Sequence, residues 1–266
     1  MSVLIVIPAR YASTRYPGKP LATLTGATGE TKSLIQRSWE AASGVAGVDR
    51  VVVATDDERI KAAAHAFGAE VVMTSESCGN GTERCAEAFQ NLGGGYDIIV
   101  NLQGDAPLTP HWFIEDLVKG LRADPHSEVA TPVLRCEGRA LNGFLQDRAA
   151  GRVGGTTAVF GAGGRALYFS KEVIPYTGQS YGDDAPTPVF HHVGVYAYRP
   201  TALADYAGWD MGPLESLEGL EQLRFLERGR SVLCVEVEAR GRQFWELNNP
   251  EDVPRIQTMM AEMGMA

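Results

Sequence analysis

The first half of the chain alternates short apolar runs with amphipathic segments. The runs at residues 3–7, 50–54, 70–74 and 96–102 are rich in β-branched residues, a pattern typical of strands covered on both faces. Residues 31–46, 57–67, 83–92 and 112–122 instead repeat apolar positions at helical spacing. Strands alternating with helices over about 120 residues predict a parallel, doubly wound sheet.

The pattern changes after residue 130, where strand-like and helix-like segments no longer alternate. Residues 128–135, 156–160, 166–170, 192–198 and 231–237 predict strands, residues 217–227 and 250–263 predict helices, and residues 171–190 predict a loop. We expect a single α/β domain over residues 1–266, in which a Rossmann-like, doubly wound, mostly parallel sheet is joined by a smaller mixed α+β lobe.

Polar segments follow each of the first four predicted strands. They span residues 8–19, 55–56, 75–84 and 103–105. Ligands on parallel sheets bind beyond the carboxyl ends of the strands, where such segments meet. The sequence therefore predicts a ligand site at this edge of the sheet.

The first of these segments carries three cationic side chains and no acidic one. Arg10, Arg15 and Lys19, together with backbone N–H groups, are suited to neutralise and wrap phosphate oxygens. The spacing matches neither GxxxxGK[ST] nor GxGxxG, which argues against a P-loop ATPase and against an NAD-dependent enzyme. The alternative interpretation is a solvated surface loop with ordinary charges.

Two further segments at this edge have chemistry of their own. Asp105 directly follows the fourth strand and can bind a Mg²⁺ ion that bridges a triphosphate, although a turn-forming Gly-Asp pair is the alternative. Residues 79–84 begin a helix, with Thr82 as the expected N-cap. The free N–H groups at such a helix start suit a base carbonyl or a phosphate, although a plain capped turn would have the same sequence pattern.

Composition restricts the cellular compartment and the classes of binding partner that we expect. The formal net charge of −9 argues against non-specific nucleic-acid binding, which needs a basic surface. No apolar run approaches the roughly 20 residues that span a bilayer, and the N-terminal run reads as a strand rather than a signal peptide, so we expect a cytoplasmic protein without membrane insertion. The four cysteines lack metal-ligand spacing, and we expect them to be reduced, partly buried thiols.

Long motifs occur in a particular order along the chain. They are PARYASTRYPGKPL at 8–21, VVVATDDERI at 51–60, NGTER at 80–84, VNLQGDAPL at 100–108, ALYFSKEVIPY at 166–176, HHVGVYAYR at 191–199 and PLESLEGLEQLRFLERG at 213–229. This order resembles the 3-deoxy-manno-octulosonate (Kdo) cytidylyltransferases over nearly the whole chain. The resemblance implies a cytoplasmic homodimer that transfers CMP from CTP to the anomeric hydroxyl of Kdo, with Mg²⁺ as cofactor, for lipopolysaccharide synthesis.

The resemblance also implies roles for individual residues. On the CTP side, in residues 1–130, it implies nucleotide contacts by Ala9, Arg10, Arg15, Lys19, Ser75, Asn80, Gly81, Thr82 and Gln103. For the sugar, it implies contacts by Gln103, His192, Tyr196, Glu215 and Glu218, the last four in residues 131–266, the half it assigns to acceptor and dimerisation. Asp105 and Asn248 correspond to the metal ligands, and Asp105, Lys19 and Arg15 to the catalytic groups. For Tyr196 packing in a strand is the alternative, and for the two glutamates helix capping or solvation.

The chain departs from the family pattern at two places. Asn248 stands where the family usually has a second metal-binding aspartate, and an uncharged amide oxygen attracts Mg²⁺ less strongly. Residues 152–157 lack the Asn and Lys that relatives tend to carry near the acceptor site. The acceptor could therefore be a Kdo variant, a sialic-acid-like sugar or another organic acid, and a non-catalytic nucleotide-binding module is a further alternative. Either a carboxylate or a metal-activated hydroxyl would serve as the base.

Overall fold

The computed structural model describes residues 1–13, 16–105, 107–153, 155–242, 245–247 and 249–265. The chain forms two compact units. Unit 1 comprises Met1–Glu115, Tyr198–Ala207 and Ala239–Ala266, and unit 2 comprises Asp116–Ala197 and Gly208–Glu238. No helix in the described part of the chain is both long and apolar enough to cross a membrane.

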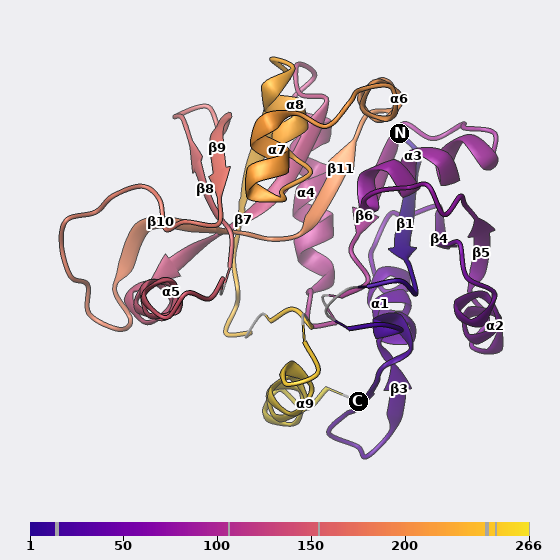
Figure 1. Cartoon of the computed structure of the whole chain (residues 1–266), viewed down its shortest axis with the longest axis horizontal. Coiled ribbons are helices and arrows are strands. Elements are labelled where there is room, and N and C mark those ends of the chain that lie inside the picture. The colour runs from indigo at the N-terminus through magenta and orange to yellow at the C-terminus, as the bar shows by residue number, and fades with distance from the viewer. Residues whose placement is uncertain (14–15, 106, 154, 243–244, 248, 266) are drawn as a thin grey trace. The chain divides into compact units, whose positions relative to one another are not determined.

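Unit 1 contains the predicted parallel sheet. Its central strand β1 (Val3–Ala9) pairs with β4 (Arg50–Thr55) on one side and with β6 (Ile98–Leu102) on the other. Beyond β4 lies β5 (Glu70–Met73), and all of these pairings are parallel (Figure 1). The run from Val3 to Ile7 is fully buried, as its apolar pattern predicts. Because the strands are parallel, their carboxyl ends and the polar segments after them lie at one edge.

Helices connect and cover these strands. Those of unit 1 are α1 (Leu34–Ser43), α2 (Glu58–Ala66), α3 (Gly81–Asn91), α6 (Pro200–Ala207) and α9 (Asp252–Glu262), and α4 (His111–Ala123) begins in this unit. A short 3₁₀ turn, η1 (Lys19–Leu21), and the hairpin strands β2 (Thr23–Thr25) and β3 (Thr31–Ser33) precede α1. Helix α1 therefore starts three residues later than predicted, at a Ser33 N-cap.

The predicted N-cap of α3 was wrong. The helix begins at Gly81, and Asn80 is the cap, its side-chain oxygen accepting from the Glu83 N–H at 2.9 Å. Thr82 is buried inside the first turn, where its hydroxyl lies 2.7 Å from the hydroxyl of Tyr198. Both Asn and Thr can cap a helix, and this tertiary partner is what the sequence does not reveal.

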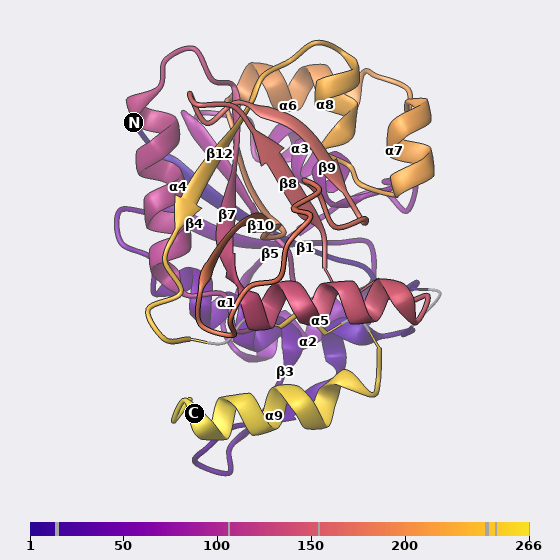
Figure 2. The same cartoon turned by 90° about the vertical axis from the view of Figure 1, so that its left-hand side faces the viewer.

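Unit 2 is built on a mixed sheet. Strand β7 (Val129–Glu137) pairs in parallel with β12 (Val232–Val237) and antiparallel with β10 (Pro186–His192). Strands β8 (Thr157–Phe160) and β9 (Ala166–Ser170) continue antiparallel from β10. Helix α5 (Gly138–Ala149) packs on β7 and β10 (Figure 2).

Two predicted elements of unit 2 are each divided, and one predicted loop is part strand. The predicted strand 192–198 is the end of β10 and the separate β11 (Val195–Tyr198), because the Val195 N–H turns back to the Val193 carbonyl at 2.7 Å. Strand β10 begins at Pro186, inside the range predicted as a loop. The predicted helix 217–227 is α7 (Pro213–Glu218) and α8 (Leu223–Glu227), separated where Gly219 takes a φ of 61°.

Helices α5 and α6 were not predicted. Helix α5 buries only Gly138 and Leu141, so its sequence lacks a clear apolar stripe. Helix α6 is a short segment, Pro200–Ala207, in which small and apolar residues occupy most positions. The four cysteines are free and buried, in agreement with the sequence.

Candidate active site

The loop after β1 closes on itself before η1 begins. Gly18 has a φ of +70° and donates its N–H to the Tyr11 carbonyl at 2.9 Å. A Cβ at this position would lie 3.0 Å from the Tyr11 ring, so glycine suits both the conformation and the space. The Tyr11 ring carries the Arg59 guanidinium 3.3 Å from its centroid. Arg10 is exposed and Ala9 buried, and Arg15 lies outside the described residues.

Lys19 joins this loop to the end of β6. Its Nζ lies 2.8 Å from Oδ2 of Asp105, and the two side chains are 18% and 21% exposed. Gly104, just before Asp105, lets the backbone after β6 pass close to the end of β1, because a Cβ there would lie 3.3 Å from the carbonyl of Pro8. The structure thus brings together two of the residues that the sequence assigned to one site.

A third segment reaches Asp105 from the C-terminal end of the chain. The Asp105 carbonyl accepts the N–H of Leu247 at 2.8 Å. Asp252 of α9 holds the same segment, accepting from the Asn249 N–H at 2.7 Å and from the Trp245 indole at 3.1 Å. Asn248, the predicted second metal ligand, lies outside the described residues, but its neighbour Leu247 is hydrogen-bonded to Asp105.

The start of α3 meets the end of β6 in the same unit. A Cβ on Gly81 would lie 3.3 Å from the amide nitrogen of Asn101 and 3.5 Å from that of Gln103. Asn101 is fully buried, and within the described residues neither its amide nitrogen nor its amide oxygen has a partner. Gln103 and Gly81, both predicted nucleotide contacts, therefore lie side by side. Because Gly81 has no side chain, the amide groups of Asn101 and Gln103 fit against the start of α3.

Polar side chains of α3 hold residues 75–82, which carry predicted nucleotide contacts and are called the base-binding loop below. Sequence reasoning missed the role of these side chains. Glu83 accepts the Gly79 N–H at 2.7 Å, and Glu87 accepts the Ser75 N–H at 2.7 Å. Arg84 is buried and donates to Asp56 at 2.8 Å and to Thr74. Their spacing could have indicated this role. Glu83, Arg84 and Glu87 stand at positions i, i+1 and i+4 just after the loop that they hold.

The residues assigned to the sugar lie in unit 2. His192 and Tyr196 are buried, the His192 imidazole 2.9 Å from the Thr131 hydroxyl, and Tyr196 donating its O–H to Gln222 at 2.9 Å. Burial lowers the pKa of His192 to about 3, because the imidazolium loses its hydration. This ring is therefore neutral at pH 7 and acts as a hydrogen-bonding group, not as a cation.

The two candidate glutamates on α7 have different surroundings. Glu215 is buried and both of its oxygens accept from Arg224, at 2.5 and 2.8 Å. Glu218 is half-buried and accepts from the Ser170 hydroxyl at 2.6 Å and the Lys171 N–H at 2.9 Å. Neither side chain caps the start of α7, which was one alternative.

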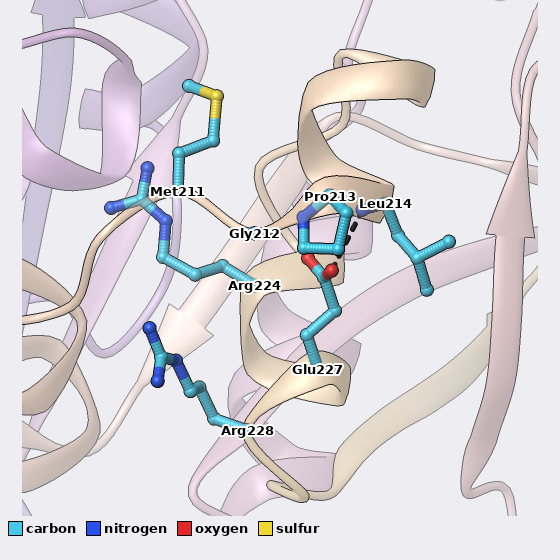
Figure 3. Close-up of a pocket in the computed structure, with 7 residues that line it drawn as sticks. All are labelled: Met211, Gly212, Pro213, Leu214, Arg224, Glu227 and Arg228. Atoms are coloured by element: carbon cyan, nitrogen blue, oxygen red, sulfur yellow. Dashed lines mark hydrogen bonds between the residues drawn. The ribbon is translucent and has the colours of Figure 1, made fainter.

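The cap of α7 comes instead from α8. Glu227 accepts the N–H groups of Leu214 at 2.8 Å and Glu215 at 3.2 Å, beside a hollow of about 430 Å³ that Arg224 and Arg228 also line (Figure 3). Gly212 makes the cap possible, because a Cβ there would clash with a carboxylate oxygen of Glu227. Helix α8 thus fixes the position of the helix that carries both glutamates.

Within the described residues, no group of three or more His, Cys, Asp or Glu side chains could hold a metal ion. Mg²⁺ commonly takes only one or two protein carboxylates and completes its shell with phosphate and water. The donor chemistry of Asp105 fits such a site, because its carboxylate is 21% exposed and supplies oxygen ligands of the kind that Mg²⁺ prefers.

Comparison with known proteins extends over the whole chain. A family model described as "Cytidylyltransferase" matches residues 4–232. A 3-deoxy-manno-octulosonate cytidylyltransferase of Maricaulis maris is 45% identical over 264 residues, which is 99% of each chain. The mitochondrial 3-deoxy-manno-octulosonate cytidylyltransferase of Arabidopsis thaliana is 39% identical over 99% of this chain and 85% of its own.

A solved structure supports the same likeness at the level of the fold. It is a CMP:2-keto-3-deoxy-manno-octonic acid synthetase complexed with CTP, 34% identical, with a TM-score of 0.82 over 99% of this chain and 100% of the other. The expected α/β class with a mixed, largely parallel sheet is confirmed by this match and by the strand pairings.

Proposed function

Because the chain belongs to the Kdo cytidylyltransferase family, we propose that it transfers CMP from CTP to Kdo and releases diphosphate. Membership of this family of nucleotidyltransferases, expected from the motifs, is confirmed. The observation that carries the proposal is the contact of Lys19 with Asp105, where the loop after β1 meets the end of β6. A cation and a carboxylate at this edge are the groups that a metal-bound triphosphate requires.

The residues of unit 1 bind and orient the nucleotide. Arg10, Arg15 and Lys19 neutralise the triphosphate, and the loop held by α3 encloses the cytosine. Asp105, with the amide of Asn248, would hold the divalent cation, which when bound withdraws charge from the phosphates. Transfer of this kind depends on positioning and charge neutralisation, so no nucleophilic side chain is required.

The residues of unit 2 bind the acceptor sugar. Neutral His192 and the Tyr196–Gln222 pair supply polar contacts. Glu218 supplies a carboxylate whose partners are neutral, two hydroxyls and a backbone N–H. Glu215 serves the site by fixing α7 through Arg224, since both of its oxygens are already paired. The homodimer, the cytoplasmic location and the link to lipopolysaccharide synthesis stay predictions.

The test is diphosphate release from CTP and Mg²⁺ with Kdo, a Kdo variant and a sialic acid as acceptors. We expect release with Kdo at a kcat/KM at least about 100-fold above that with sialic acid, because a site built to pair a substrate's polar groups rejects one that leaves them unpaired. Asp105→Asn is expected to lower turnover about 100-fold or more with an unchanged melting temperature. Binding of CTP without release of diphosphate in the presence of any acceptor would instead indicate a non-catalytic module.

A further inference from the structure

The Lys19 ammonium forms an ion pair with Asp105, the carboxylate that the proposed reaction needs to bind a divalent cation. The 2.8 Å contact uses Oδ2 of Asp105, and the two side chains are about one-fifth exposed, so solvent and ligands can reach the pair. A divalent cation cannot approach Asp105 without strong repulsion from an ammonium this close. The pair therefore has to separate before Asp105 can bind a metal.

The surrounding backbone allows Lys19 to leave without rearranging its loop. The Lys19 N–H donates to the Tyr16 carbonyl at 3.2 Å, and its own carbonyl accepts from Ala22 at 3.0 Å. The main chain is thus held on both sides of the residue. The flexible four-carbon stem of a lysine can then carry the charge to another anion by rotation alone.

We propose that Lys19 holds Asp105 in place of the divalent cation until a nucleoside triphosphate draws the ammonium away, so that the metal site forms together with the nucleotide. The proposal rests on the proposed function, because it assigns the phosphates to Lys19 and the metal to Asp105. The triphosphate gives the ammonium a stronger partner and also supplies further metal ligands. Binding of the nucleotide and of the metal is therefore coupled, and the coupling is reciprocal.

The first test measures Mn²⁺ binding to the full chain without nucleotide, by the electron paramagnetic resonance signal of free Mn²⁺. Lys19→Met should lower the Kd of one site by about tenfold, because it removes the competing charge next to Asp105. Lys61→Met is the matched control, since Lys61 makes an exposed ion pair with Glu58 on α2 and its loss changes the net charge equally. It should change the Kd less than about twofold.

The double variant Lys19→Met/Asp105→Asn locates the gain. If the tighter site is at Asp105, the gain is lost in the double variant. An unchanged Kd in Lys19→Met, or a gain that persists in the double variant, would overturn the proposal. Lys19→Gln repeats the measurement in case the methionine variant has a lowered melting temperature.

The second test measures binding of CTP in the presence of EDTA by calorimetry. With Lys19 present, Asp105→Asn should tighten metal-free CTP by about tenfold, because the ammonium no longer has to leave a carboxylate. In the Lys19→Met background the same substitution should have a clearly smaller effect. Equal effects in both backgrounds would contradict the exchange.

The two proposals fail separately. Wild-type protein that binds CTP but releases no diphosphate with Kdo would refute the proposed function, while the Mn²⁺ and CTP measurements still test the exchange. Normal turnover with an unaltered Mn²⁺ affinity in Lys19→Met would refute the exchange alone.

Discussion

At the scale of single residues, Glu215 and Arg224 form a buried ion pair that holds α7 in position. Both side chains are 3% exposed, and the guanidinium binds both carboxylate oxygens. Removing one partner of such a pair leaves a buried charge without compensation. We expect Glu215→Gln to lower the free energy of unfolding by about 3 kcal/mol, measured by denaturant unfolding followed by circular dichroism.

Glu218→Gln is the matched variant on the same helix. Its partners are neutral donors, so we expect a loss of no more than about 1.5 kcal/mol together with a raised KM for the sugar acid. A stable Glu215→Gln protein with a raised KM for the sugar would show instead that Glu215 contacts the acceptor directly.

Two adjacent histidines, the half-buried His191 and the buried His192, predict a pH dependence of stability. Burial lowers the pKa of His191 to about 4 and that of His192 to about 3, both below the ordinary value of 6.5. Well above pH 6.5 both rings are neutral whether the chain is folded or unfolded. As the pH falls below 6.5, protons bind first to the unfolded chain, so stability is lost down to about pH 4.

In this window each histidine should add about 1.4 kcal/mol per pH unit to the slope of the unfolding free energy against pH. His192→Gln, whose amide can replace the bond to Thr131, should make the fall between pH 6 and pH 4.5 shallower by about that amount per unit. His65→Gln on the exposed surface of α2 should leave the slope unchanged. Denaturant unfolding at a series of pH values measures both, and equal slopes in wild type and His192→Gln would contradict the assignment.

At the scale of elements, α3 both stabilises unit 1 and holds the predicted base-binding loop. Its N-cap Asn80 also donates to the Tyr206 hydroxyl of α6 at 2.8 Å. We expect Asn80→Ala to lower the unfolding free energy by about 1 kcal/mol and to raise the KM for CTP several-fold, because the loop loses its fixed end. Steady-state kinetics and denaturant unfolding measure the two effects.

Ser33→Ala is the control for this element. Ser33 caps α1 of the same unit, accepting from the Gln36 N–H at 3.3 Å, and is not among the predicted nucleotide contacts. A similar loss of stability is expected, with the KM for CTP unchanged. If both variants raised the KM equally, the effect would come from general loosening of unit 1 and not from the position of α3.

At the scale of the whole molecule, large apolar side chains are exposed unevenly between the two units. Those exposed in unit 2 are Leu145, Val153, Leu167, Tyr176, Met211, Leu214 and Leu217, against Met1 in the described part of unit 1. Leu167 is 66% exposed and lies on β9, the last strand of the β7–β10–β8–β9 series. Exposed apolar groups on an edge strand favour association with another chain.

We therefore expect self-association through unit 2, in line with the predicted homodimer. Light scattering should give twice the chain mass of 28.7 kDa. Leu167→Lys should shift the protein toward monomer at the same concentration, because a charge on an edge strand opposes pairing. The control Lys61→Met on α2 should leave the mass unchanged, and a monomeric wild-type protein would refute the expectation.

The sequence by itself determined the parallel sheet of unit 1, the edge where its polar segments meet, and the family. Buried parallel strands need continuous apolar runs, and these are visible without a structure. The bounds of β1, β4 and β6 therefore agree with prediction to within two residues, and Lys19 and Asp105 lie together as expected.

Tertiary structure decided what depends on partners distant in sequence. Gly219 ends α7 and divides a pattern that is periodic across both helices, and Asn80 rather than Thr82 caps α3 because the Thr82 hydroxyl is buried against Tyr198. The pairing of Glu215 with Arg224 likewise depends on how α7 and α8 pack. Local propensity records which residues could take each role, whereas burial and the nearest polar atom select the one that does.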